Sequence, residues 1–168
     1  MKKKFFQVPI AAVTAVLILS SLVSVGFSQR ADLEWQITVD GDVAPTLTIT
    51  LADIIAMPRT TVGAELTCYG LPLQDGDWTG VKLGFLLGEV GVIEPNMAVT
   101  FKASDGYEVK DFPMAVAMRE DVILAYELDG QPLPETIRLV VPGANGNVWI
   151  KLITQITIEA ASSSTPFS

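Results

Sequence analysis

Short runs of alternating apolar and polar residues, separated by turn signals, constrain the fold of this chain more than any other feature. The run 34–39 alternates around Trp35, Ile37 and Val39, which is typical of a strand with one buried face. Asp-Gly and Gly-rich segments between the runs predict turns. Runs of this kind cover residues 34–39, 46–50, 60–67, 97–103, 122–128, 137–141, 148–153 and 155–158. The pattern predicts about eight short strands.

Three short segments have helical character instead. They cover residues 51–57, 81–90 and 114–118. Thr50 is a suitable N-cap and Pro58 a stop for the first, while Thr79 and Gly91 are expected to bound the second. Together the runs predict an α+β domain, predominantly β, with mixed sheets, two or three short helices and one hydrophobic core.

The first 28 residues differ in composition from the rest. Three lysines at 2–4 precede an uncharged, mostly apolar run at 8–25, and small residues follow at Gly26 and Ser28. This pattern predicts either a cleaved signal peptide or an N-terminal anchor, with possible membrane anchoring through residues 5–27. Both alternatives make the domain at 29–160 extracytoplasmic, secreted or anchored to the membrane, and we expect residues 161–168 to form a flexible tail.

Charge narrows the possible partners of the domain. All 19 Asp and Glu residues lie beyond residue 28, whereas three of the 11 Lys and Arg residues lie before it, so the remainder carries 8 − 19 = −11. Such a chain repels phosphate backbones, and nucleic acid is not an expected partner. The sequence contains no histidine, which excludes a Ser-His-Asp triad and imidazole metal ligands.

Cys68 is the only cysteine, and it follows the strand-like run 60–67. A segment rich in turn residues comes next, from Gly70 to Asp77, so we expect the thiol at a strand end beside a loop. A single cysteine forms no intrachain disulfide. Two roles remain open on these grounds, a small buried apolar side chain or a reactive or metal-binding thiol.

Several phrases occur in a particular order over residues 34–159. They are Trp35-x-Ile37-x-Val39-x-Gly41, Leu47-Thr48-x-x-x-Leu51-x-Asp53-Ile54, Leu66-Thr67-Cys68, Trp78-x-Gly80-Val81-x-Leu83, Ala103-x-Asp105-Gly106-Tyr107, Ile123-Leu124-Ala125-Tyr126, Arg138-Leu139-Val140-Val141-Pro142-Gly143, and Lys151 with Ile156. This ordered set resembles the oxidoreductase molybdopterin-binding domain of the sulfite oxidase superfamily. The resemblance implies the fold of that superfamily.

The resemblance also implies a cofactor, molybdopterin with molybdenum, and a small-molecule substrate. Cys68 stands where the family places a metal ligand, and a soft thiolate suits a metal also held by dithiolene sulfurs. The implied chemistry is two-electron oxygen-atom transfer, which the cofactor carries. The chain has no CxxCH motif or iron–sulfur cysteine set, so an external electron-transfer protein is implied.

Further residues have implied roles near the cofactor. Arg138 and Lys151 are implied phosphate partners, and backbone amides of the glycine-rich loop are candidates for the same end of the cofactor. The loop residues are Gly143, Asn145 and Gly146. For Lys151 a solvated strand position is the alternative, and for Gly146 an ordinary turn. Trp78 either walls the site or is a core aromatic residue.

Asp105 and Tyr107 flank a turn from which they could reach the cleft.

Three departures from the family bear on function. The domain has few basic residues, so an anionic substrate such as sulfite is disfavoured and a neutral one is expected. The N-terminus has lysines and no arginine pair, and the segment 134–137 is short.

Two hypotheses follow from the resemblance and these departures. One is a molybdopterin-dependent oxidoreductase that acts on a neutral small molecule. The alternative is a cofactor-free extracytoplasmic binding or interaction module that retains the fold.

Overall fold

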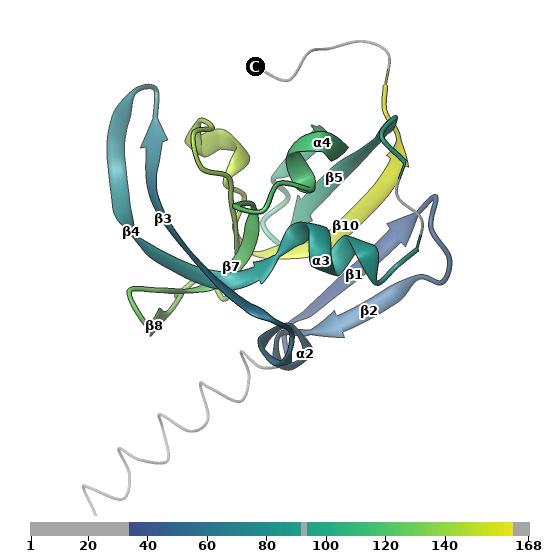
Figure 1. Cartoon of the computed structure of the whole chain (residues 1–168), viewed down its shortest axis with the longest axis horizontal. Coiled ribbons are helices and arrows are strands. Elements are labelled where there is room, and N and C mark those ends of the chain that lie inside the picture. Colours follow the sequence, from purple (N-terminus) through teal and green to yellow (C-terminus); the bar gives the residue numbers. More distant parts are fainter. Residues whose placement is uncertain (1–33, 92–93, 163–168) are drawn as a thin grey trace, which may run out of the picture. The chain divides into compact units, whose positions relative to one another are not determined.

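The computed structural model of the chain describes residues 34–91 and 94–162 (Figure 1). The predicted signal peptide or anchor at 1–28 lies outside these residues, as does most of the tail at 161–168. No helix within the described residues is long and apolar enough to cross a membrane. The domain described below begins at Trp35.

One five-stranded sheet has the order β2-β1-β10-β5-β6. Its strands are β1 (Gln36–Gly41), β2 (Leu47–Thr50), β5 (Met97–Ala103), β6 (Glu108–Pro113) and β10 (Ile153–Ala160). The pair β1 and β10 is parallel, with Val39 opposite Ile156, and the other pairs are antiparallel. The sheet is therefore mixed, as predicted.

The second sheet follows the order β3-β4-β7-β8, with β9 also paired to β7. Its strands are β3 (Arg59–Cys68), β4 (Leu71–Lys82), β7 (Ile123–Leu128), β8 (Gln131–Pro132) and β9 (Arg138–Val140). Because β7 pairs only with residues 78–82 of β4, the rest of the β3–β4 hairpin extends past its neighbours. Figure 1 shows this hairpin as a long curved arm.

Within residues 34–91 and 94–162, three short α-helices and one 3-10 helix connect the strands. They are α2 (Leu51–Ala56), α3 (Leu83–Gly88), α4 (Met114–Ala117) and η1 (Gly146–Val148). The predicted Thr50 cap of α2 is confirmed, because its hydroxyl accepts from the Asp53 amide while the Asp53 carboxylate accepts from the Thr50 amide. The predominantly β fold with short helices matches the sequence-based prediction.

Three local predictions were wrong. Residues 71–77 form part of β4 and not a loop, because β3 supplies cross-strand hydrogen bonds to this turn-rich stretch. Thr79 lies in β4, so α3 begins only at Leu83. The predicted strand at 148–153 is mostly replaced by η1 and a single bridge between Arg138 and Lys151.

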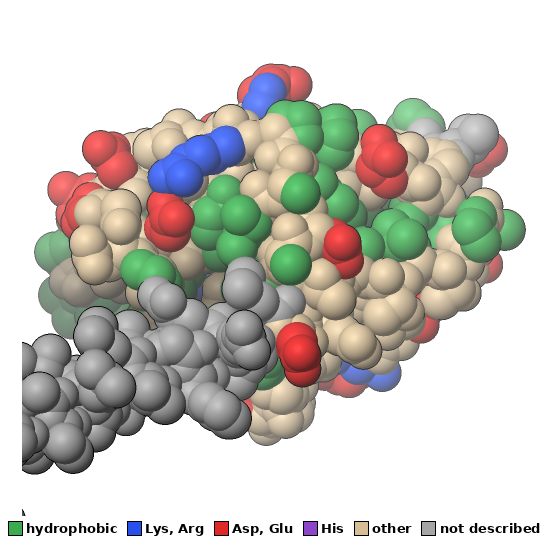
Figure 2. All heavy atoms as spheres, turned by 90° about the horizontal axis from the view of Figure 1, so that it is seen from below, with side chains coloured by type: hydrophobic (Ala, Val, Ile, Leu, Met, Phe, Trp, Pro, Cys, Tyr) green, Lys and Arg blue, Asp and Glu red, His purple; other side chains and the backbone are tan. Residues whose placement is uncertain are grey.

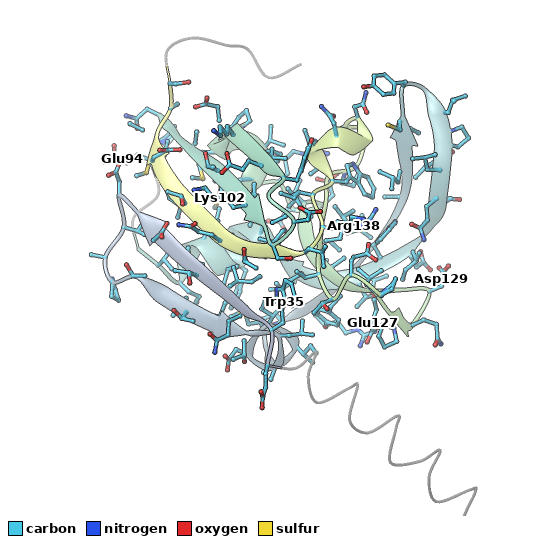
Figure 3. All side chains as sticks on the ribbon, turned by 180° about the vertical axis from the view of Figure 1, so that it is seen from behind. Trp35, Glu94, Lys102, Glu127, Asp129 and Arg138 are labelled. Carbon is cyan, nitrogen blue, oxygen red and sulfur yellow. The ribbon has the colours of Figure 1, made fainter. Side chains whose placement is uncertain are left out.

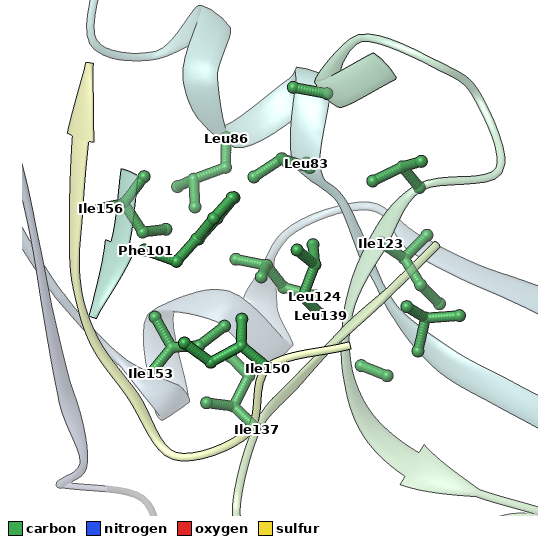
Figure 4. Packing of buried hydrophobic residues seen from close by; sticks show 14 of the residues in the cluster. Leu83, Leu86, Phe101, Ile123, Leu124, Ile137, Leu139, Ile150, Ile153 and Ile156 are labelled. Atoms are coloured by element: carbon green, nitrogen blue, oxygen red, sulfur yellow. The ribbon is translucent and has the colours of Figure 1, made fainter. Parts of the chain in front are cut away.

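The hydrophobic core lies between the sheets and the helices, as Figure 4 shows. Phe101 of β5 and Phe112 of β6 pack edge to face with ring centroids 5.5 Å apart. Leu83 and Leu86 of α3, together with Leu124 of β7, are fully buried against this core.

Candidate functional site

A cleft of about 340 Å³ brings together most of the chemically capable side chains singled out in the sequence. The hairpin contributes Cys68, the turn between β5 and β6 contributes Asp105 and Tyr107, and β9 and the segment that bridges to it contribute Arg138 and Lys151. Its volume lies within the range of small-ligand sites.

Cys68 is the last residue of β3 and a half-buried free thiol. Tyr69 and Gly70 follow with φ angles of 50° and 77°, so the chain reverses in two residues and Cys68 pairs with Leu71. The side chains of directly paired residues project from the same face of the hairpin. Cys68 and Leu66, two residues apart on β3, both line the cleft.

Arg138 is held by two groups behind the cleft. Its Nε lies 2.5 Å from Oε1 of Glu135, and its guanidinium lies 5.7 Å from the ring centroid of Trp78. The Nε atom is buried and makes no aligned hydrogen bond, so the contact with Glu135 is chiefly electrostatic. Figure 3 shows Arg138 on the hairpin side of the molecule. Its charge is partly neutralised before any ligand arrives.

Lys151 is exposed at the cleft and differs from the other cations. Of the seven Lys and Arg residues at 34–91 and 94–162, six form ion pairs with Asp or Glu. Lys151 forms none within this described part. The Lys151 ammonium group can therefore bind an anion in the cleft without first breaking an ion pair.

Besides its backbone bonds, the turn between β5 and β6 is held by two hydrogen bonds that involve side chains. The Tyr107 amide donates to Oδ1 of Asp105 over 3.0 Å, and the Tyr107 hydroxyl donates to the Asn147 carbonyl over 2.8 Å. The second bond joins the turn to η1, which contains Asn147. Asp105 therefore places a carboxylate in the wall of the cleft with one oxygen already engaged.

The glycine-rich loop is divided between two hollows. Gly146 lines the cleft beside Cys68, and a Cβ there would come within 2.8 Å of the Thr67 carbonyl oxygen. Gly143 and Asn145 instead line a second hollow of about 380 Å³, with Arg119. The structure does not bring these two loop residues to the cleft of Cys68.

Trp78 lies in the core and not in the cleft wall. It is fully buried, and its Nε1 donates to the Ala64 carbonyl over 3.0 Å. Its ring meets Trp149 edge to face, with centroids 5.6 Å apart, and Trp149 lines the cleft. Trp149 and Glu135 are the residues that sequence reasoning missed. No local pattern signalled the ion pair between Glu135 and Arg138, because residues 135–138 form a turn leading into β9 and not a helix, on which a three-residue spacing would bring the side chains together.

The donor set bears on how a metal could be held. Within the described residues, no three His, Cys, Asp or Glu side chains cluster as a metal site. A metal at Cys68 would therefore take its remaining ligands from another group. A cysteine and two cations that line one cleft are residue types that fit a dithiolene cofactor with a phosphate end.

The described residues thus form a β-rich domain whose cleft gathers Cys68, Arg138 and Lys151. A sequence model of the family described as oxidoreductase molybdopterin binding domain matches residues 25–167, so the chain belongs to this family. The predicted family and fold are confirmed.

The chain is similar to several larger redox proteins. It is 27% identical over 150 residues to sulfite oxidase, mitochondrial, of Rattus norvegicus, covering 70% of this chain and 28% of that protein. It is 25% identical over 166 residues to nitrate reductase [NADH] of Volvox carteri, covering 77% of this chain and 19% of that protein. The crystal structure of the sulfane dehydrogenase SoxCD from Paracoccus pantotrophus matches with a TM-score of 0.70 and 27% identity, covering 79% and 40%. The chain thus spans less than a third of the curated relatives.

Proposed function

We propose that this domain is a molybdopterin-dependent oxidoreductase with Cys68 as the protein ligand of molybdenum. When bound, the cofactor supplies two-electron oxygen-atom transfer. The observation that carries the proposal is that Lys151, the described cation without a carboxylate partner, shares one cleft with the Cys68 thiol. A soft donor and an available ammonium group are what the two ends of such a cofactor require.

The charges around the cleft favour a neutral small substrate. Asp105 places a carboxylate in the wall, while Glu135 partly neutralises Arg138. Lys151 is the cation that we assign to the phosphate end of the cofactor. An anionic substrate would therefore meet negative charge near Cys68 in a domain that already carries −11 beyond residue 28.

The electrons of this chemistry need a second protein. The sequence supplies neither a CxxCH motif nor a set of cluster-binding cysteines, so we assign electron transfer to an external carrier. We place the domain outside the cytoplasm because of the lysines and the apolar run at its N-terminus.

A cofactor-free binding module is the second candidate function. The ion pair between Arg138 and Glu135 favours it, because the guanidinium already has an anionic partner. In this case Cys68 and the cleft are retained as parts of a binding surface without metal.

Metal analysis separates the two candidates. The full chain, purified from a host with ample molybdenum and molybdopterin, is expected to contain about one molybdenum per chain by mass spectrometry, and Cys68→Ser to lose it. Lys151→Gln is expected to lower the cofactor content several-fold, measured by the fluorescence of the released and oxidised pterin. The matched control is Lys102→Gln, which removes a surface cation that pairs with Glu108.

A folded, cooperatively melting wild-type chain without molybdenum from that host would contradict the enzyme proposal and support the binding module. Equal molybdenum in the wild type and Cys68→Ser would contradict the assigned ligand.

A further inference from the structure

The free end of the β3–β4 hairpin carries a cluster of exposed apolar side chains. Tyr69 is 90% exposed, Leu71 67% and Leu73 64%, more than any other large hydrophobic residue in the described ranges. We call these three residues the hairpin tip. Burying them would release much apolar surface from water, and patches of this kind mark interaction sites.

The backbone at the tip is suited to the reversal, but Tyr69 is not. A two-residue hairpin loop with positive φ at both positions favours Asn, Asp or Gly at the first of them. Tyr69 occupies that position with a φ of 50°, a conformation that L residues with large side chains rarely adopt. A strained aromatic residue with a solvent-exposed ring is better explained by what the ring contacts than by the turn.

The flanks of the hairpin are acidic. Residues 60–81 contain Glu65, Asp75 and Asp77 and no Lys or Arg. Glu65 and Asp75 lie directly opposite each other in the strand register, an arrangement that repels. None of these three carboxylates forms an ion pair within the described part of the chain.

A fourth carboxylate lies beside the hairpin. Asp129 follows β7, and its Oδ1 accepts a hydrogen bond from the Asp77 amide over 2.9 Å (Figure 3). More generally, the face in Figure 2 carries more acidic than basic side chains. Glu65 is adjacent to Leu66, so it projects with its strand partner Asp75 from the face of the hairpin opposite the cleft, and the acidic side chains lie behind the apolar tip.

We propose that the hairpin tip is the docking surface for a basic protein. Its apolar contact residues would cover Tyr69, Leu71 and Leu73, while its Lys and Arg side chains would extend past the edge of the narrow hairpin to Glu65 and Asp75 on the opposite face. An apolar centre with a polar rim is the usual anatomy of an interface, and complementary charge speeds association. The acidic side chains disfavour an anionic membrane and a second copy of this chain, since both are negatively charged.

The tip adjoins the candidate site. Leu73 lines the cleft, and Leu71 is the strand partner of Cys68, so a protein on the tip lies at the cleft entrance. Assigning this surface to the external electron carrier rests on the proposed function. The docking surface itself does not, because it is argued from exposure and charge alone.

Binding to a basic probe protein tests the proposal. The probe is oxidised cytochrome c, a small basic protein with an exposed apolar haem edge, titrated into the purified full chain by calorimetry at low salt. The double variant Leu71→Ser/Leu73→Ser is expected to raise the Kd for the probe at least tenfold. The matched control, Ile55→Ser/Phe85→Ser, removes two apolar side chains that are 43% and 40% exposed elsewhere and is expected to change the Kd less than twofold.

The acidic side chains have their own variant. Glu65→Gln/Asp75→Asn is expected to slow association several-fold and to reduce its dependence on salt. Circular dichroism on each variant establishes that it is folded. Wild-type chain that fails to bind the probe, or tip and control variants that bind equally, would overturn the proposal.

Two other occupants would also overturn it. They are zwitterionic phosphatidylcholine vesicles that bind the wild type but not the tip variant, and a wild-type dimer in sedimentation that the tip variant abolishes. Molybdenum is measured on the same preparations. A metal-free chain that binds the probe would support the docking surface and contradict the enzyme proposal. A molybdenum-loaded chain that does not bind the probe would support the enzyme proposal and contradict the docking surface.

Discussion

Arg138 shows how one residue joins the core to the cleft. Its guanidinium contacts the Trp78 ring on one side and the Glu135 carboxylate on another, while the residue also lines the cleft. A partly buried cation in this position is costly without its carboxylate. Glu135 therefore stabilises the fold and also sets how much positive charge the cleft presents.

Replacing Glu135 tests this dual role. We expect Glu135→Gln to lower the free energy of unfolding by about 1–3 kcal/mol, because Arg138 keeps its charge at 14% side-chain exposure. The matched control is Glu120→Gln, whose carboxylate pairs with Lys82 at 84% exposure and should cost less than about 0.5 kcal/mol. Urea denaturation measures both values. Equal costs would show that the buried position adds nothing to the ion pair.

Strand β4 depends near its C-terminal end on a residue without a side chain. A Cβ at Gly80 would lie 2.0 Å from the Leu124 carbonyl oxygen of β7. We expect Gly80→Ala to cost about 2–3 kcal/mol or more, since backbone has to move to make room. The matched control is Gly88→Ala at the end of α3, where nothing lies within 4 Å and a gain of about 0.5–1 kcal/mol is expected. Thermal unfolding that ranks the variants otherwise would contradict this close approach.

The start of helix α2 predicts a pH dependence. The Thr50 hydroxyl and then the Thr50 amide lower the pKa of Asp53 from its usual 3.8 by hydrogen bonding. A lowered pKa stabilises the fold above the unfolded value, and this contribution is lost as the pH falls through the folded pKa, below 3.8. Asp53→Ala should therefore lower the Tm at neutral pH by more than it does in acid below that window. A constant Tm difference at every pH would contradict the capping role of the charge.

At the scale of the whole molecule, charge opposes folding. The chain beyond residue 28 carries −11, so salt should screen self-repulsion and raise stability. We expect a gain of about 1 kcal/mol, or roughly 3–5 °C in Tm, between low and physiological salt. The exposed substitution Glu89→Lys, which replaces one negative charge by one positive charge, should show a smaller gain. A Tm that falls with salt in scanning calorimetry would contradict this account.

The sequence was a good guide where local rules and tertiary contacts agree. The Thr50 cap and the strand at 97–103 were predicted because capping chemistry and alternation act locally. Residues 71–77 were misjudged because their turn residues were outweighed by pairing with a strand that has to be formed first.

The candidate site follows the same division. The ordered resemblance was enough to nominate Cys68, Arg138 and Lys151, and all three line one cleft. The division of the glycine-rich loop between two hollows depends on packing against Thr67, which no local pattern reports. The predicted roles of these residues stay predictions.

The position of β10 has a consequence for when the domain can form. This strand is the centre of its sheet, and its neighbours β1 and β5 come from far earlier in the chain. Until residues 153–160 have been synthesised, the sheet consists of two separate halves that share no hydrogen bonds. Contacts of such long sequence separation fold slowly. A nascent chain of this topology therefore cannot complete its first sheet until translation has passed β10, and until then its N-terminal half lacks the strand that joins it to the rest of that sheet.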